Sequence, residues 1–349
     1  MPKVVILFNC RPFFYGMHGR GPHPSSLLHC LWSREMSWQR SRSAFNLCRI
    51  SLAVALGFAT CGRMMAVAAP TGSADDVSPA ALVRSAVANE VAANQNTSVR
   101  HFFRSRKETP HGTQTRLYVE TNEAIAGMTV AYEDKPVSEE QLQGELHRLQ
   151  HLMADPNDLR RKQKQEREDA EHTLRIVKAL PDAFVYEFDG TQPSQPEVGK
   201  PGDELVRLQF QPNPRYSPPS RVEQVLMGMH GYILIDKGAL RLAKIDATLF
   251  REVSFGWGIL GHLDKGGQFV VEQADVGDGA WEITHIQLNF TGKIMLVKSL
   301  VIKSDETLSD FRRVPADLTF AQGVEMLKQE WAKLQQENSG TATASKNTH

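Results

Sequence analysis

Tight turns recur between short runs of alternating apolar residues in the second half of the chain, and this pattern limits the fold more than any other feature. The turn pairs are 189–190, 236–238, 265–267, 278–279 and 291–292, and each contains Gly or Asp, which accept positive φ. The runs between them leave no room for crossover helices, so neighbouring strands are expected to pair antiparallel. The predicted strands are 184–188, 205–210, 231–236, 239–245, 268–273, 281–290 and 294–303.

One predicted strand changes phase along its length. Trp281 and Ile283 lie in phase, but after Thr284-His285 the apolar residues, beginning with Ile286, take the opposite phase. A β-bulge produces such a shift, so we expect strong curvature here. A sheet of this length with one apolar face must curl or be covered.

Helical spacing marks the segments that could cover this sheet. Ser78-Pro79 precedes valines at helical spacing and predicts an opening helix, and strands 101–107, 116–121 and 125–132 follow it. Capping boxes predict two further helices, over 220–227 and from Thr319 to about Leu334, which we expect to cover the apolar face. The expected fold class is α+β: a curved antiparallel sheet, or half-barrel, with an N-terminal helix, an inserted helical hairpin and a C-terminal helix.

The inserted hairpin is predicted over residues 134–180, a highly charged segment. Ser138 with Gln141 starts its first helix, and Asp155-Pro156 separates the two helices. The run of alternating charges from 160 to 172 is expected to be a solvated helix face, with a docking surface as the alternative.

An apolar run near the start of the sequence predicts export. Residues 50–59 follow three arginines and precede Ala66-Val67-Ala68, a small-x-small cleavage pattern, so this segment has the features of a signal peptide. The run is too short to span a membrane, and no later segment is apolar enough to do so. Acylation of Cys61 is the alternative outcome of processing.

The domain assignment follows from this prediction. We expect translation from Met36, so that residues 1–35 are a non-native upstream extension and 36–69 are the signal peptide. Residues 70–337 form a single half-barrel domain, and 338–349 are a disordered tail. The expected location is the periplasm or cell envelope.

Charge and cysteine positions exclude several classes of function. The first 68 residues hold eight of the 40 basic side chains, one of the 40 acidic ones and all four cysteines, which leaves a net charge of −7 from Ala69 onward. This balance argues against nucleic-acid binding, which needs a basic face. The mature chain has no thiol for a disulfide, a nucleophile or a zinc-cysteine site.

Two motifs fit their familiar roles poorly. Residues 256–261 match GxGxxG, but a turn and another strand follow where a dinucleotide site needs a helix N-terminus. His147 and His151 have the spacing of metal ligands on a helix, yet that helix is strongly polar, so surface histidines are expected. We therefore predict no cofactor and no metal.

Catalytic signatures are also missing from the sequence. It contains no GxSxG motif and no recognisable carboxylate pair, and most aspartates of the strand region occupy turn positions. We expect a protein that is not an enzyme, with a hydrolase of unrecognised motif as the remaining catalytic hypothesis.

The order of elements over about residues 77 to 335 resembles that of the Lol-type periplasmic lipoprotein carriers and related half-barrels. Three runs, PNPRYSPPSR (212–221), FGWGILGHLDKGGQF (255–269) and DVGDGAW (275–281), are similar to those of a group of uncharacterised secreted bacterial proteins. The first resemblance implies an open barrel that holds acyl chains against apolar side chains under a helical lid. The long charged hairpin departs from those compact carriers.

The function expected from this resemblance is binding of an apolar or acylated ligand, a lipid or lipoprotein, without covalent chemistry. Each buried methylene contributes about 0.8 kcal/mol, so an apolar groove alone could extract such a ligand. The alternative is an envelope scaffold protein with a filled core, which docks an envelope partner through the charged hairpin. The residues predicted to line the groove are Val206, Leu208, Phe210, Phe269, Val271, Trp281 and Ile283.

Overall fold

The computed structural model describes residues 78–256, 260–294 and 298–346, and describes side chains as far as Glu337. The predicted upstream extension (1–35), the signal peptide (36–69) and Cys61 therefore lie outside the described residues.

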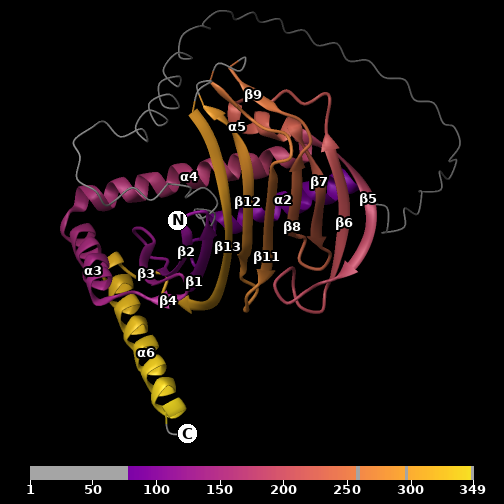
Figure 1. Cartoon of the computed structure of the whole chain (residues 1–349). Coiled ribbons are helices and arrows are strands. Elements are labelled where there is room, and N and C mark those ends of the chain that lie inside the picture. The colour runs from indigo at the N-terminus through magenta and orange to yellow at the C-terminus, as the bar shows by residue number, and fades with distance from the viewer. Residues whose placement is uncertain (1–77, 257–259, 295–297, 347–349) are drawn as a thin grey trace, which may run out of the picture. The chain divides into compact units, whose positions relative to one another are not determined.

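One open antiparallel sheet forms the frame of the described domain (Figure 1). From edge to edge its strands are β4 (Lys135–Pro136), β3 (Ala126–Tyr132), β2 (Gly112–Val119), β1 (Arg100–Thr109), β13 (Lys298–Val314), β12 (Trp281–Ile294), β11 (Gln268–Asp275), β8 (Arg241–Leu249), β7 (Met229–Asp236), β6 (Glu204–Pro212) and β5 (Phe184–Pro193). Two short strands, β9 (Val253–Phe255) and β10 (Gly261–Leu263), pair with each other, and β10 also pairs with β12. The predicted antiparallel α+β half-barrel is confirmed.

The predicted bulge lies at the expected position in β12. Ile283 pairs with Gln273 of β11 and His285 pairs with Glu272, which leaves Thr284 without an opposite residue. The phase change in the sequence is therefore the trace of this bulge, which increases the local twist and bends the strand.

Two helices cover one face of the sheet: α2 (Pro79–Gln95) and α4 (Pro156–Ala183) (Figure 1). The Ser78 side chain caps α2 by accepting a hydrogen bond from the Ala81 amide, as the sequence predicts. Val83 and Val87 of α2 and Leu180 of α4 enter one core cluster with alternate residues of β5 to β8 and β11 to β13. The short helix α5 (Arg221–Gln224) and the 3-10 turn η2 (Val225–Gly228) adjoin this core through Leu226.

The opposite face of strands β1 to β3 carries a second core. Phe103 enters the first cluster, whereas its neighbour Phe102 packs with Leu117 of β2 in a cluster closed by α3 (Glu139–Ala154) and α6 (Phe320–Lys346). The expectation that the C-terminal helix covers the same face as the others is wrong, because its stripe, including Phe320 and Leu327, fits the face that α2 and α4 leave uncovered.

The inserted hairpin is confirmed as α3 and α4, with the Ser138–Gln141 capping box in place. The charged run from 160 to 172 is not wholly a solvated face, however, because Glu166 and Ala170 are buried. Glu166 accepts a hydrogen bond from the Ile125 amide at 3.2 Å and bonds Lys162 Nζ at 2.6 Å, so its charge is compensated inside the fold.

The end of α6 differs from the sequence expectation. The helix continues to Lys346, so helical backbone occupies most of the segment 338–349 that the sequence assigns to a disordered tail. The predicted apolar stripe ends near Leu334, and a packing pattern cannot locate the end of a helix that continues past it. Among the described helices, none is long and apolar enough to cross a membrane.

Candidate functional site

Six of the seven predicted groove residues come together in the first core cluster. Val206, Leu208, Phe210 and Val271 are buried there, and Phe269 and Ile283 pack against it. The register explains this grouping, because Val206 and Leu208 of β6 pair with Ile235 and Ile233 of β7, and Val271 pairs with Ile286 of β12. The sequence correctly identifies a shared apolar strip.

This strip is filled by the protein itself in the described conformation. Val83, Ala86 and Val87 of α2 and Leu180 and Ala183 of α4 belong to the same cluster as the groove residues. The helices therefore lie where an open groove would hold a ligand.

Trp281 is the exception among the predicted groove residues. It packs with Leu205 of β6 and Leu234 of β7 in a separate cluster. Leu205 and Leu234 are the sequence neighbours of Val206 and Ile235, so this cluster uses the other face of those strands. Ile283, two residues further along the same strand, packs against the first cluster, so the alternation used in the sequence does not by itself place Trp281.

Trp281 instead contributes to a cavity of about 410 Å³ at the C-terminal end of α2. The cavity walls come from α2, β1, β8, β13 and the turn between β11 and β12, including Ala93, His101, Phe311 and Arg313. Phe311 also stacks on Phe103 of the first core, with ring centroids 5.6 Å apart. The cavity thus has an aromatic wall continuous with the apolar core.

Two residues that line this cavity, Arg241 and His101, are each paired with a glutamate. Arg241 makes a bidentate pair with Glu90 of α2, with Nε–Oε1 and Nη2–Oε2 distances of 2.8 Å, and both side chains are only 13% exposed. His101 Nδ1 lies 2.9 Å from Glu282 Oε1, and this pair is also buried. The charges of Arg241 and Glu90 therefore compensate each other within the protein, and His101 lies beside Glu282 as its partner.

Two further charged side chains that line the cavity have no such partner. Arg313 of β13 and Asp278 of the β11–β12 turn are exposed. Within the part of the chain that the structure describes, neither side chain has a hydrogen bond or an ion pair. They can therefore meet a charged ligand without first losing a protein contact.

A second, smaller cavity of about 30 Å³ adjoins the first and shares Ala93, Arg241 and Trp281 with it. Asn94 lines this cavity, is 9% exposed, and its Oδ1 has no hydrogen-bond partner among the described residues. A buried acceptor without a donor is costly, and the volume suits one water molecule or a group of that size.

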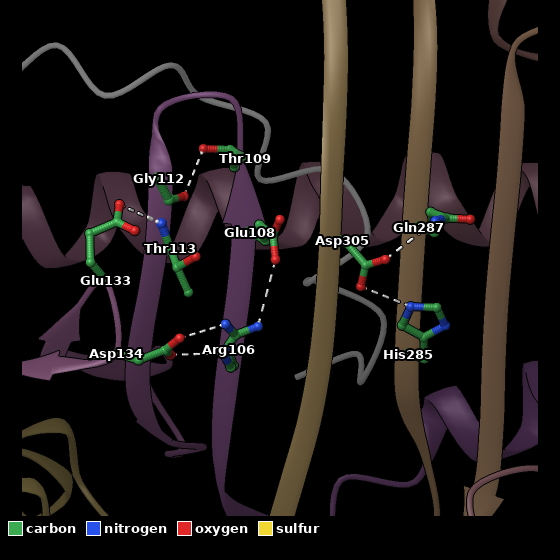
Figure 2. A network of polar contacts seen from close by, with 10 residues as sticks. All are labelled: Arg106, Glu108, Thr109, Gly112, Thr113, Glu133, Asp134, His285, Gln287 and Asp305. Atoms are coloured by element: carbon green, nitrogen blue, oxygen red, sulfur yellow. Dashed lines mark hydrogen bonds and ion pairs between the residues drawn. The ribbon is translucent and has the colours of Figure 1, made fainter.

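A charged ladder of cross-strand contacts lies elsewhere on the sheet. His285 contacts Asp305 at 3.0 Å and Glu272 at 3.3 Å, and Lys244 bonds Glu272 at 2.8 Å; Figure 2 shows the Asp305 end of this ladder, with Gln287 beside it. The hydrogen bond with His285 and the contact with Lys244 lower the pKa of Glu272 to about 2 despite its partial burial. The same carboxylates raise the pKa of His285. The ladder connects four neighbouring strands, which fits a structural role.

One group of side chains has the composition of a metal site. One ligand atom each from Glu252, His262 and Asp264 lies within 4.8 Å of the others. Ser254 Oγ donates to Glu252 Oε1 at 2.8 Å and Thr291 Oγ1 donates to Asp264 Oδ2 at 2.7 Å, so both carboxylates are already bonded. All three side chains are at least partly exposed, so the composition of this group alone does not indicate a bound metal.

The GxGxxG run and the His147–His151 pair occupy the structural positions that the sequence predicts for them. Gly261 starts strand β10, so a strand and not a helix follows the GxGxxG run, whose residues 257–259 lie outside the described ranges. His147 is exposed, and His151 Nδ1 lies 3.1 Å from Asp158 on the next helix. Neither observation indicates a nucleotide or metal site.

Comparisons with known proteins add little to this geometry. No protein-family model matches the chain, and no curated protein matches it. Among solved structures the chain is similar to a domain from Vibrio parahaemolyticus described as a candidate outer membrane lipoprotein-sorting protein, with 10% identity and a TM-score of 0.26. The match covers 70% of this chain and 97% of that one.

The cavity at Trp281 is the feature that sequence reasoning missed. His101 and Arg313 lie opposite each other on paired strands, although more than 200 positions separate them. Only the pairing of β1 with β13 brings them together, and no local sequence pattern predicts that pairing. Trp281 is the one cavity residue that the sequence analysis singled out, and it was predicted to line the apolar groove instead.

Proposed function

We propose that this protein is an exported envelope protein that binds an apolar or acylated ligand without covalent chemistry, as a lipid or lipoprotein carrier does. The observation that supports it is the cavity of about 410 Å³, whose volume lies within the range of about 300–1,000 Å³ usual for small-molecule sites. Trp281 and Phe311 supply its aromatic side chains, and polar atoms form more of its lining than apolar ones.

The ligand in this proposal occupies the cavity and not the filled strip. Its apolar part lies against Phe311, which already touches the core through Phe103. Each methylene that leaves water contributes about 0.8 kcal/mol, so a short buried length of chain gives measurable affinity. A longer chain would have to displace α2, whose Val83 and Val87 fill the strip that includes Leu208.

Titration of the purified full chain with single-chain amphiphiles below their micelle concentration tests this proposal by calorimetry. Mass spectrometry of an organic extract of the protein, purified after export, shows whether a lipid accompanies it. We expect F311A to lose most of the binding and F188A, which removes the same ring from an exposed position, to keep it. No heat of binding from any chain-bearing compound, with an extract free of lipid, would refute the proposal.

The filled core favours a second candidate, an envelope scaffold protein that docks a partner through the α3–α4 hairpin. Arg160, Lys164 and Arg167 are exposed on α4 and would supply such a surface. The same extraction separates the two candidates, because the scaffold needs no ligand. Charge reversal at Arg160 and Arg167 should then abolish partner capture and leave amphiphile binding unchanged.

A further inference from the structure

The two adjoining cavities have polar features that an acyl chain alone does not explain. The large cavity holds two charged side chains of opposite sign, Arg313 and Asp278, that lack protein partners within the described residues. The small cavity holds a buried acceptor, Asn94 Oδ1, that lacks a donor there. A ligand suited to this place must therefore offer more than an apolar surface.

The other ionisable side chains near the site already have protein partners. Glu90 and Arg241 neutralise each other, and Glu282 has His101 as a neighbour at 2.9 Å. A ligand with a single negative charge would satisfy Arg313 and leave Asp278 facing it, which costs affinity through like-charge repulsion. A ligand with one positive and one negative group satisfies both side chains.

We propose that this end of the cavity recognises a zwitterionic headgroup that carries a phosphate and a primary ammonium. Arg313 binds the phosphate, because a guanidinium presents several N–H donors to phosphate oxygens. Asp278 binds the ammonium, and Trp281 and Phe311 hold the apolar part beside them. Asn94 accepts a hydrogen bond from the water or the N–H group that enters the small cavity.

The turn that carries Asp278 supports its assignment. Asp278 adopts φ +54° between Gly277 and Gly279, which have φ of +114° and +69°. The Gly277 amide is bonded to Asp275 Oδ1, and the Ala280 amide to the Gly277 carbonyl, so the turn is held from both sides. A fixed turn reduces the ordering cost when the carboxylate meets its ligand.

This inference rests on the proposed function, so its test compares ligands that share a chain and differ in their headgroup. Calorimetry of the full chain uses lysophosphatidylethanolamine, lysophosphatidylglycerol and a maltoside of the same chain length, and free phosphoethanolamine as the compound without a chain. We expect lysophosphatidylethanolamine to bind about tenfold more tightly than lysophosphatidylglycerol, which corresponds to about 1.4 kcal/mol. The maltoside should bind more weakly still.

Two variants assign the headgroup contacts. D278N keeps a residue that tolerates positive φ and should remove the preference for ethanolamine over glycerol. R313Q should weaken both phosphate ligands about tenfold and leave the maltoside unchanged, whereas R167Q, which removes an arginine from α4 and not from the cavity wall, should change nothing.

Each outcome bears on one of the two proposals. Equal binding of the three chain-bearing ligands overturns the headgroup inference and leaves the ligand-binding function intact. Binding of none of them overturns the function. Free phosphoethanolamine that binds as tightly as the lysolipid supports the zwitterion contacts but contradicts a lipid as their source.

Discussion

Replacement of Phe210 by alanine measures whether the predicted groove is a packed core. Phe210 is 5% exposed, and its ring centroid lies 4.5 Å from that of Phe184 and 6.3 Å from that of Tyr186. Truncation of a fully packed phenylalanine costs about 3–5 kcal/mol, which combines lost transfer free energy, a cavity and lost ring contacts. We expect a decrease in the free energy of unfolding of about 4 kcal/mol for F210A.

The neighbouring strand offers a matched control. Phe188 of β5 is 64% exposed, so about one third of its surface is buried and F188A should cost only about 1 kcal/mol. Urea unfolding followed by circular dichroism gives both values from the midpoint and slope. If Phe210 lined an open groove, the two variants would differ by less than about 1 kcal/mol, and the conclusion that α2 and α4 fill the strip would be refuted.

Four further predictions concern polar contacts. The folded pKa of Glu272 is about 2 and its ordinary value is 4.5, so its contribution to stability is complete above pH 4.5 and is lost as the pH falls toward 2. The free energy of unfolding of E272Q should therefore depend less on pH over this acidic range. The pKa of His285 is raised above 6.5, so its contribution to stability is complete below pH 6.5 and is lost as the pH rises through the folded pKa. H285Q should remove this loss of stability on the alkaline side. E90Q and R241Q should each destabilise by about 2 kcal/mol, and the double variant by less than their sum in urea unfolding; additive effects would show that the pair is not coupled. S138A should cost about 1 kcal/mol through loss of the α3 cap, and no change in midpoint would contradict that role.

The sequence predicted the features that depend on local pattern. The Thr284 bulge was visible as a change of phase, and the Ser138 capping box as a residue pair three apart. Val206, Leu208 and Phe210 alternate within one strand, so their common face followed from the period of two alone.

Features that depend on distant contacts could not be read in the same way. The sequence shows that Arg313 is charged, but not that β13 lies beside β1 and brings His101 to the same cavity. The run of alternating charges on α4 was expected to be solvated because Glu166 is charged, and only the Ile125 amide and Lys162 explain the burial of Glu166. Tertiary pairing, and not local preference, decides such positions.

The pairing of β1 with β13 also determines when the domain can form. Arg100 lies opposite Val314, so the central ladder of the sheet joins strands that are synthesised at the beginning and the end of the domain. Until β13 is available, β1 and β12 both present unpaired edges, and closing so long a loop makes assembly slow. The complete sheet therefore assembles only after its last strand, β13, has been synthesised.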